Sequence, residues 1–228
     1  SARNFQYGYG VGAYGQEAYG VARSSSTLSL DATTWSFDTF QDEFLAQPTA
    51  GNLYSFEIGT DSVLQTVTNA PTNNQYMLVS DQQHIICFGA SNDRQLIKWS
   101  SAGSLTDWTA TATNSAGSLT LTDDSFIRCA RKIRQGILVF TDRNVYLMSY
   151  LGSPFYYGIN RIASNCGTLS NKATVAIQDQ LFYMGHNDFF VYNGSSISST
   201  HLKIGDETFF RYAPGTIASL ITCLLTYP

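Results

Sequence analysis

Four β-hairpins of similar design recur along the chain, and this repeat constrains the fold more than any other feature. Each hairpin consists of an apolar run, a turn and an alternating run, which is the pattern of two paired strands. The hairpins occupy residues 42–59, 81–100, 135–152 and 178–194. The third and fourth contain the polar turns TDRN and GHND between their halves. The chain is therefore expected to be built from strands.

The second strands of these hairpins are evenly spaced. Their aligned apolar positions, which are separated by 43, 49 and 44 residues, are Phe56, Trp99, Met148 and Tyr192. A period of roughly 45 residues made of strands is typical of a β-propeller blade, which has four strands. Further strands are predicted between the hairpins, at 62–68, 117–122, 125–133 and 168–177.

No segment has a long helical period, so the predicted fold class is all-β. Two architectures stay open: a β-propeller-like fold with about four recognisable blades, which the regular spacing favours, and a β-sandwich. Four blades is a small number, so we expect the propeller to be incomplete in this chain unless the N-terminal segment helps to close it. The predicted organisation is a Tyr/Gly-rich loop or arm (1–24), a propeller domain (25–205) and a C-terminal strand or connecting segment (206–228).

The composition favours a protein that buries part of its surface against neighbours. Charged residues make up 13% of the chain, against roughly 25% in an average protein, and aromatic residues make up 14%. The net charge of −4 disfavours general binding of nucleic acid, because phosphate contacts need a basic surface. It suits a surface that DNA slides past. The longest apolar stretch, IASLITCLL, is too short to cross a bilayer, and no signal peptide is recognisable, so assembly in the cytoplasm without a membrane anchor is expected.

No catalytic, metal or cofactor site is predicted. The four cysteines (87, 129, 166 and 223) and three histidines (84, 186 and 201) lack the spacing of metal ligands, and the cysteines are interpreted as reduced thiols. Six aspartates sit at turns, which is the ordinary use of this residue: Asp42, Asp81, Asp107, Asp142, Asp179 and Asp188. Two partial matches to the Asp box of sialidases, at 29–35 and 104–109, have the wrong spacing. We therefore expect that the protein is not an enzyme.

One cluster of cations, RCARKIR, contains Arg128, Arg131, Lys132 and Arg134, which are four of the thirteen cations of the chain. In a strand, Arg128, Lys132 and Arg134 share one face, and Arg131 points to the other. Two interpretations stay open. The cluster is either a solvated edge strand whose charges prevent aggregation, or a docking stripe for an acidic neighbour or for DNA phosphate.

The opening segment YGYGVGAYGQEAYG (7–20) repeats Tyr-Gly at intervals of five residues, which fits neither a helix nor a strand. Glycine permits bends, and tyrosine supplies a large, partly polar contact area. A loop that contacts partners or the channel is one interpretation, with contact residues Tyr7, Tyr9, Tyr14 and Tyr19. A floppy low-complexity terminus is the other.

Three longer stretches (98–121, 139–174 and 181–194) carry a family resemblance. Their shared motifs are Trp99-Ser100, Asp107-Trp108-Thr109, Asn114-Ser115-Ala116-Gly117, Thr141-Asp142, Asn165-Cys166-Gly167, Tyr183-Met184-Gly185, Phe189-Phe190 and Asn193-Gly194. With these motifs the chain resembles the tail-nozzle, or tail-hub, proteins of short-tailed double-stranded DNA phages, some of which are called phage stabilisation proteins.

The resemblance implies a structural subunit of the phage tail in the virion, without enzyme activity or cofactor. It implies a homohexameric ring below the portal and adaptor, whose propellers form the wall of the channel for DNA ejection. The implied partners are other copies of the chain, adaptor proteins, tail fibre or spike proteins, and genomic DNA that passes without specific binding. Two rivals remain: a receptor- or glycan-binding propeller at the tail tip, whose exposed aromatic residues stack on sugars, and, more weakly, a hydrolase.

Overall fold

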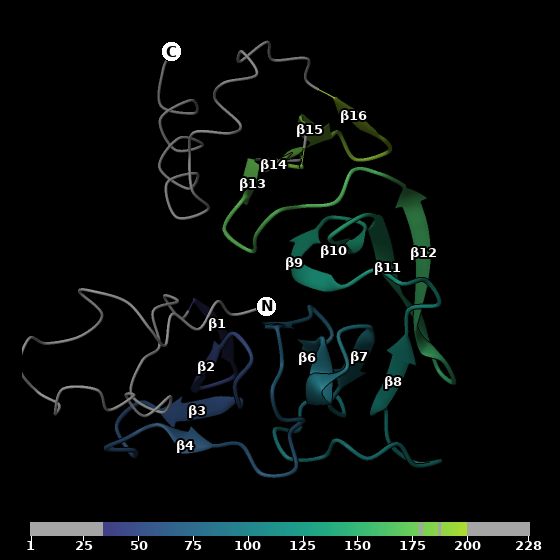
Figure 1. The fold of residues 1–228 in the computed structure, drawn as a ribbon. Helices are drawn as coiled ribbons and strands as arrows, with labels where there is room; N and C mark the ends of the chain where they lie inside the picture. Colours follow the sequence, from purple (N-terminus) through teal and green to yellow (C-terminus); the bar gives the residue numbers. More distant parts are fainter. Residues whose placement is uncertain (1–33, 178–179, 187, 200–228) are drawn as a thin grey trace, which may run out of the picture. The chain divides into compact units, whose positions relative to one another are not determined.

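The computed structural model describes residues 34–177, 180–186 and 188–199, and in this part of the chain the protein is all-β (Figure 1). In the described ranges, sixteen strands form four separate four-stranded antiparallel sheets, and the one helical element there is a short 3-10 helix, η2 (Ala90–Asn92). None of the described helices is long and apolar enough to cross a membrane. The four predicted tyrosine positions of the N-terminal arm and the predicted C-terminal segment 206–228 lie outside the described residues.

Each sheet is a meander in which neighbouring strands follow one another in the sequence. Sheet 1 contains β1 (Trp35–Phe40), β2 (Glu43–Pro48), β3 (Tyr54–Glu57) and β4 (Gln65–Thr66). Sheet 2 contains β5 (Tyr76–Val79), β6 (Ile85–Phe88), β7 (Leu96–Trp99) and β8 (Gly117–Thr120). Sheet 3 contains β9 (Ile127–Ile133), β10 (Gly136–Thr141), β11 (Val145–Gly152) and β12 (Tyr156–Ala163). Sheet 4 contains β13 (Thr174–Ile177), β14 (Gln180–Met184), β15 (Phe189–Tyr192) and β16 (Ile197–Ser199).

The four predicted hairpins are confirmed as the second and third strands of the four sheets. The four aligned residues also occupy one register, because each pairs with the second residue of the strand before it. The pairs are Phe44–Phe56, Ile86–Trp99, Ile137–Met148 and Leu181–Tyr192. Four separate meanders are compatible with a propeller-like arrangement of about four blades, and they do not form the two face-to-face sheets of a sandwich.

The sheets pack against one another in chain order through three hydrophobic clusters. Phe40 and Leu45 of sheet 1 meet Met77 and Val79 of sheet 2. The cluster between sheets 2 and 3 includes Ile86, Phe88, Trp99, Ile137, Val139 and Met148. The cluster between sheets 3 and 4 includes Leu138, Phe140, Leu181, Tyr183 and Tyr192. Because successive side chains of a strand point to opposite faces, each inner sheet contributes to two clusters.

Four strands were not predicted: β1, β5, β12 and β16. The strand β5 has the sequence YMLV, and three of its four residues are buried, so it shows no alternation by which a half-buried strand is recognised. The neighbouring strand β6 is buried at all four positions for the same reason, since sheet 2 is covered on both faces. Burial on both sides is a property of the sheet stack, and it is not encoded in any one strand.

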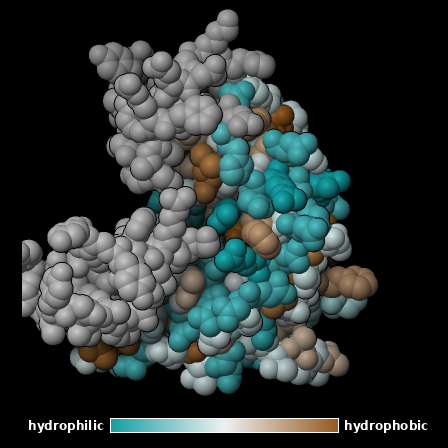
Figure 2. Space-filling model, in the orientation of Figure 1, coloured by the Kyte–Doolittle hydropathy of each residue, from teal (hydrophilic) through white to brown (hydrophobic). Residues whose placement is uncertain are grey.

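Sheet 1 carries aromatic side chains on the face that points away from sheet 2. Trp35 stacks on Phe37, and Phe37 stacks on Phe44, with ring centroids 6.1 and 5.5 Å apart. Phe44 in turn pairs across the strands with Phe56, and the side chain of Phe37 is 58% exposed. The coloured residues in the view of Figure 2 are mostly hydrophilic, with scattered hydrophobic residues.

Candidate functional site

The predicted cation cluster lies on β9 and in the turn that follows it. The strand β9 is at the edge of sheet 3, as the first interpretation of the cluster requires. Arg128, Lys132 and Arg134 are exposed, and Arg131 is half-buried. The strand alternates regularly from Cys129 to Ile133, whereas a register shift opposite Phe140 and Thr141 interrupts the alternation at Arg128. Arg134 itself belongs to the two-residue turn between β9 and β10.

Arg131 is not a solvated surface residue, because its guanidinium group bridges three segments. Nη1 donates hydrogen bonds to the hydroxyl of Tyr76 on β5 and to the carbonyl of Ala130 (3.0 Å), and Nη2 donates to the carbonyl of Asn171 (2.6 Å). The guanidinium carbon also lies 5.3 Å from the ring centroid of Tyr76, a cation–π distance. Burial raises the pKa of Tyr76, and the positive charge of Arg131 partly opposes this effect.

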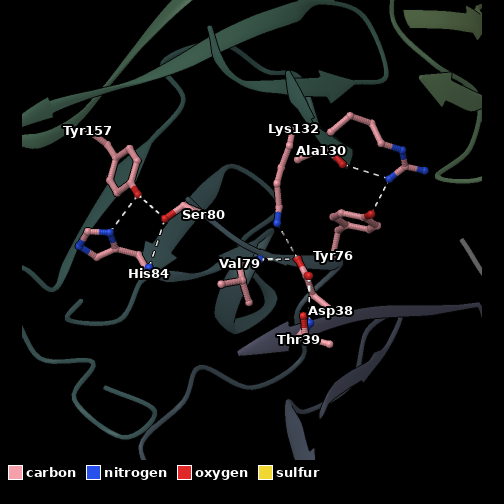
Figure 3. Close-up of polar contacts among 10 residues, drawn as sticks. Asp38, Thr39, Tyr76, Val79, Ser80, His84, Ala130, Lys132 and Tyr157 are labelled. Atoms are coloured by element: carbon pink, nitrogen blue, oxygen red, sulfur yellow. Dashed lines mark hydrogen bonds and ion pairs between the residues drawn. The ribbon is translucent and has the colours of Figure 1, made fainter. Parts of the chain in front are cut away.

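Lys132 points to the other side of β9, where it forms an ion pair with Asp38 of β1 (Figure 3). The distance from Nζ to Oδ2 is 3.4 Å. The same carboxylate oxygen accepts a hydrogen bond from the backbone N–H of Val79 on β5 (2.7 Å). Asp38 therefore joins the first strands of sheets 1, 2 and 3. The sequence analysis did not single out Asp38. The one sequence feature that could have indicated it is a carboxylate in the middle of an aromatic strand, where aspartate is uncommon.

The segment that leads into sheet 4 also reaches this region. Nζ of Lys172, two residues before β13, donates a hydrogen bond of 3.3 Å to the carbonyl of Trp35 on β1. Together with the contacts of Arg131 and Lys132, this bond makes a polar network that links the first strands of sheets 1 to 3 and the approach to β13. We call this set of contacts the first-strand network.

Two cations of the predicted cluster remain outside the network. Among the described residues, Arg128 and Arg134 have no carboxylate at ion-pair distance. They are six residues apart, which is about 20 Å along a strand. The cluster thus does not present four free charges in one row, and two of its four members stabilise contacts between sheets.

A second polar cluster lies between sheets 2 and 3, around His84, whose side chain is 1% exposed. Its Nδ1 is 3.0 Å from the hydroxyl of Tyr157, which donates to Oγ of Ser80 (2.8 Å), and its Nε2 is 3.1 Å from Oγ of Ser115 (Figure 3 shows the first two contacts). Burial lowers the pKa of His84 and raises the pKa of Tyr157 to about 12. The arrangement suits a neutral imidazole whose two nitrogens are both hydrogen-bonded.

Three of the predicted turn aspartates stabilise loops through hydrogen bonds. Asp107 accepts two hydrogen bonds from Nδ2 of Asn114 (3.1 and 2.9 Å), and Asp142 accepts one from the backbone N–H of Phe126 (2.7 Å). Asp188 accepts one from the backbone N–H of Phe189 (2.7 Å). Asp42 and Asp81 are exposed, and Asp179 lies outside the described residues. Within the described ranges, no group of three or more His, Cys, Asp or Glu side chains could hold a metal ion.

Three of the four cysteines are in the described part of the chain: Cys87, Cys129 and Cys166. All three are buried and free, in agreement with the prediction of reduced thiols. Burial raises the pKa of each of them. Thiols in this state pack as small apolar side chains and are poor nucleophiles.

The motif residues of the 98–121 stretch fix the long loop between β7 and β8. Nε1 of Trp99 donates to the carbonyl of Ser115 (2.9 Å), and Nε1 of Trp108 donates to the carbonyl of Leu105 (2.8 Å). A Cβ atom at Gly117 would lie 2.5 Å from the ring of Trp99, so only glycine fits there without a shift. The two tryptophans are almost completely buried.

The motif residues of the other two stretches join sheets 3 and 4. The backbone N–H of Cys166 donates to the carbonyl of Arg143 (2.9 Å), and that of Thr168 donates to the carbonyl of Thr141 (2.9 Å). A Cβ atom at Gly167 would lie 2.3 Å from the backbone of Asp142 and Arg143. The turn between β10 and β11 is therefore in direct backbone contact with the segment that crosses to sheet 4.

No protein-family model matches the chain, and no curated protein matches its sequence. Two solved structures are similar in part. The extracellular domain of the hybrid two component system BT4673 from B. thetaiotaomicron is 12% identical, with a TM-score of 0.48, and the match covers 72% of this chain and 21% of that one. Hsv2 of Kluyveromyces lactis is 14% identical, with a TM-score of 0.40, over 69% of this chain and 43% of that one. The chain thus spans less than half the length of either structure, and TM-scores below 0.5 carry no conclusion about its function.

Proposed function

We propose that the chain is a structural subunit of the tail nozzle of a short-tailed double-stranded DNA phage, and that it forms a homohexameric ring around the channel for DNA ejection. The observation that carries this proposal is the use of the motif residues. Trp99, Trp108, Gly117 and Gly167 all serve close packing or hydrogen bonds between loops and sheets. A structural protein depends on such contacts between its loops and sheets. The motif residues of an enzyme would instead direct reactive groups into a cavity.

The aromatic face of sheet 1 supports association with further copies. Stacked rings at Trp35, Phe37 and Phe44 leave Phe37 exposed, on the side of the sheet that does not pack on sheet 2. Exposed aromatic groups of this kind are typical of surfaces that a neighbour covers. The low content of charged residues agrees with a subunit that buries part of its surface.

The charge of the whole chain supports a conduit for DNA, not a DNA-binding site. The net charge is −4, and the two cations Arg131 and Lys132 are engaged by groups of the protein itself. A lumen that holds phosphate only weakly lets the genome slide, because each tight contact would add to the barrier for movement. Adaptor proteins and fibre or spike proteins would dock on the outer faces, and the protein would reside in the virion.

Electron microscopy tests the proposal. The expected result is a six-fold ring, in purified protein or in virions that contain it. The variant Phe37→Lys should reduce ring formation strongly, because it places a charge on the aromatic face. Phe155→Lys, at a position that is 74% exposed in the turn between β11 and β12, is the matched control. A protein that is monomeric at all concentrations and absent from virions would contradict the proposal.

A further inference from the structure

A pocket of about 350 Å³ lies between sheets 3 and 4, beside the turn that contains Arg134. Its polar lining residues are Lys132, Arg134 and Gln135 from sheet 3 and Gln180, Asn193 and Ser195 from sheet 4. A volume of this size is at the lower end for sites of small molecules, which hold roughly 300–1,000 Å³. The pocket can take one ring-sized ligand.

The walls of the pocket are held in place by their own hydrogen bonds. The hydroxyl of Tyr192 donates to Oε1 of Gln135 (2.6 Å), across the boundary between the two sheets. Oδ1 of Asn193 accepts from the backbone N–H of Ser195 (3.1 Å), its hydroxyl (3.0 Å) and the N–H of Ser196 (3.0 Å). The oxygen of each amide is thus occupied, and its NH₂ group remains as a donor. A site with fixed side chains loses little entropy when it binds a ligand.

The pocket is rich in hydrogen-bond donors and includes one cation, Arg134, that has no carboxylate at ion-pair distance within the described residues. The ammonium group of Lys132 is directed away from the pocket, to Asp38 at 3.4 Å. No carboxylate is among the described lining residues of this pocket. A second hollow of about 270 Å³ on the opposite side of the same turn does include a carboxylate, that of Asp81. The guanidinium group of Arg134 is the described group of this pocket that can bind an anion.

We propose that this pocket binds an acidic monosaccharide unit of the uronic acid class. The guanidinium of Arg134 binds the carboxylate, for which its planar pair of N–H donors is suited. The amide groups of Gln135, Gln180 and Asn193 bind ring hydroxyls, and the apolar side chains of Ile133 and Ala176 face the carbon side of the ring. This inference goes beyond the structural role proposed above and does not depend on it.

Nucleic acid is the less suitable ligand for this pocket. Single-stranded binding sites combine a basic groove with exposed aromatic rings on which bases stack. Among the described lining residues the one aromatic side chain, that of Tyr192, is buried, and its hydroxyl donates to Gln135. The sequence interpretation of glycan binding relied on exposed aromatic residues that stack on sugars. In this pocket, hydrogen-bond donors and the charge of Arg134 would bind the sugar instead.

Titration of the 228-residue chain with glucuronic acid, glucose and inorganic phosphate tests the proposal, with calorimetry or ligand-detected NMR as the readout. Glucuronic acid should bind at least about ten-fold more tightly than glucose, which lacks the carboxylate, because a charge-assisted hydrogen bond is lost. Arg134→Gln should abolish this difference. The control Arg128→Gln, which makes the same change of charge within the same cation cluster but outside the pocket, should leave it intact.

Three outcomes would overturn the proposal: no binding of glucuronic acid, equal loss in both variants, or phosphate binding as tight as that of glucuronic acid. The last result would identify a simple anion site without selectivity for a sugar. Circular dichroism of both variants separates a loss of binding from a loss of fold. Ring formation by electron microscopy is measured on the same samples, so failure of this inference is distinguishable from failure of the proposed structural role.

Discussion

Asp38 on β1 and Lys132 on β9 form an ion pair of 3.4 Å between the first strands of sheets 1 and 3, and Asp38 also accepts the backbone N–H of Val79 on β5 between them. One carboxylate thus connects three sheets that are remote in the sequence. The backbone hydrogen bond lies in a less exposed position than the ammonium group, so the two interactions are expected to differ in strength.

Asp38→Ala should destabilise the protein more than Lys132→Met does. The aspartate variant leaves the N–H of Val79 without its acceptor, at a cost of about 1.5–3 kcal/mol in the free energy of unfolding. The lysine variant removes only a partly exposed ion pair, which is worth about 0–1 kcal/mol. Urea denaturation measures both values. Equal effects of the two substitutions would show that the ion pair, and not the backbone hydrogen bond, is the main contribution of Asp38.

Gly117→Ala should cost about 1–3 kcal/mol of stability, because the new methyl group would lie 2.5 Å from the buried ring of Trp99. Gly158→Ala is the matched control. The new methyl group at residue 158 would lie 2.8 Å from a terminal methyl group of Leu151, and this exposed side chain can move away. Thermal unfolding compares the two variants, and a control that is destabilised as much as Gly117→Ala would contradict the role given to the Trp99–Gly117 contact.

Asp123→Asn should be destabilising, whereas the neighbouring Asp124→Asn should not. Oδ1 of Asp123 accepts from the hydroxyl of Ser125 (2.5 Å), and Oδ2 accepts from Nδ2 of Asn144 (2.6 Å) and from the hydroxyl of Tyr146. Burial tends to raise the pKa of Asp123, but these hydrogen bonds outweigh it and lower the pKa overall. An amide in its place would put a donor group against donors, at a cost of about 1–2 kcal/mol.

The carboxylate of Asp124 is on an exposed residue, so its substitution controls for the change of charge. Chemical denaturation at pH 7 measures the difference between the two variants. A similar loss in both would mean that net charge, and not the hydrogen bonds of Asp123, determines the result.

His84 should make the stability of the protein depend on pH. Burial lowers the pKa of its imidazole below the usual value of about 6.5. As the pH falls below about 6.5, the unfolded chain binds the proton before the folded chain does, so the free energy of unfolding decreases until the folded pKa is reached. Above about 6.5 both states are neutral at this residue, and the full stability is retained.

Urea midpoints at pH 7.5 and 5.5 measure this effect. His84→Gln should reduce the difference between the two midpoints, and His186→Gln, at an exposed position, should leave it unchanged. If the pH dependence were the same in all three proteins, the assignment to His84 would be wrong.

The sequence contained enough information for the hairpins, because each has an alternating or apolar pattern and a turn within about twenty residues. It also predicted the strand β9 with Arg131 on the opposite face from Lys132, and it left open whether this is an edge strand or a docking stripe. It did not predict the partners of these cations: Tyr76 and Asp38 lie on other sheets, and neither carries a local pattern that marks it as a contact. The pocket beside Arg134 was missed for the same reason, since half of its polar lining comes from sheet 4.

The sequence by itself determined the all-β class, the spacing of about 45 residues and the positions of the four hairpins, since these depend on interactions between residues close in the chain. Only the tertiary structure decided which strands are buried on both faces, where the first-strand network forms, and which cations remain without a carboxylate partner. The physical reason is that packing of one sheet on another joins side chains that are distant in the sequence, and their contacts depend on the spatial arrangement of several strands at once.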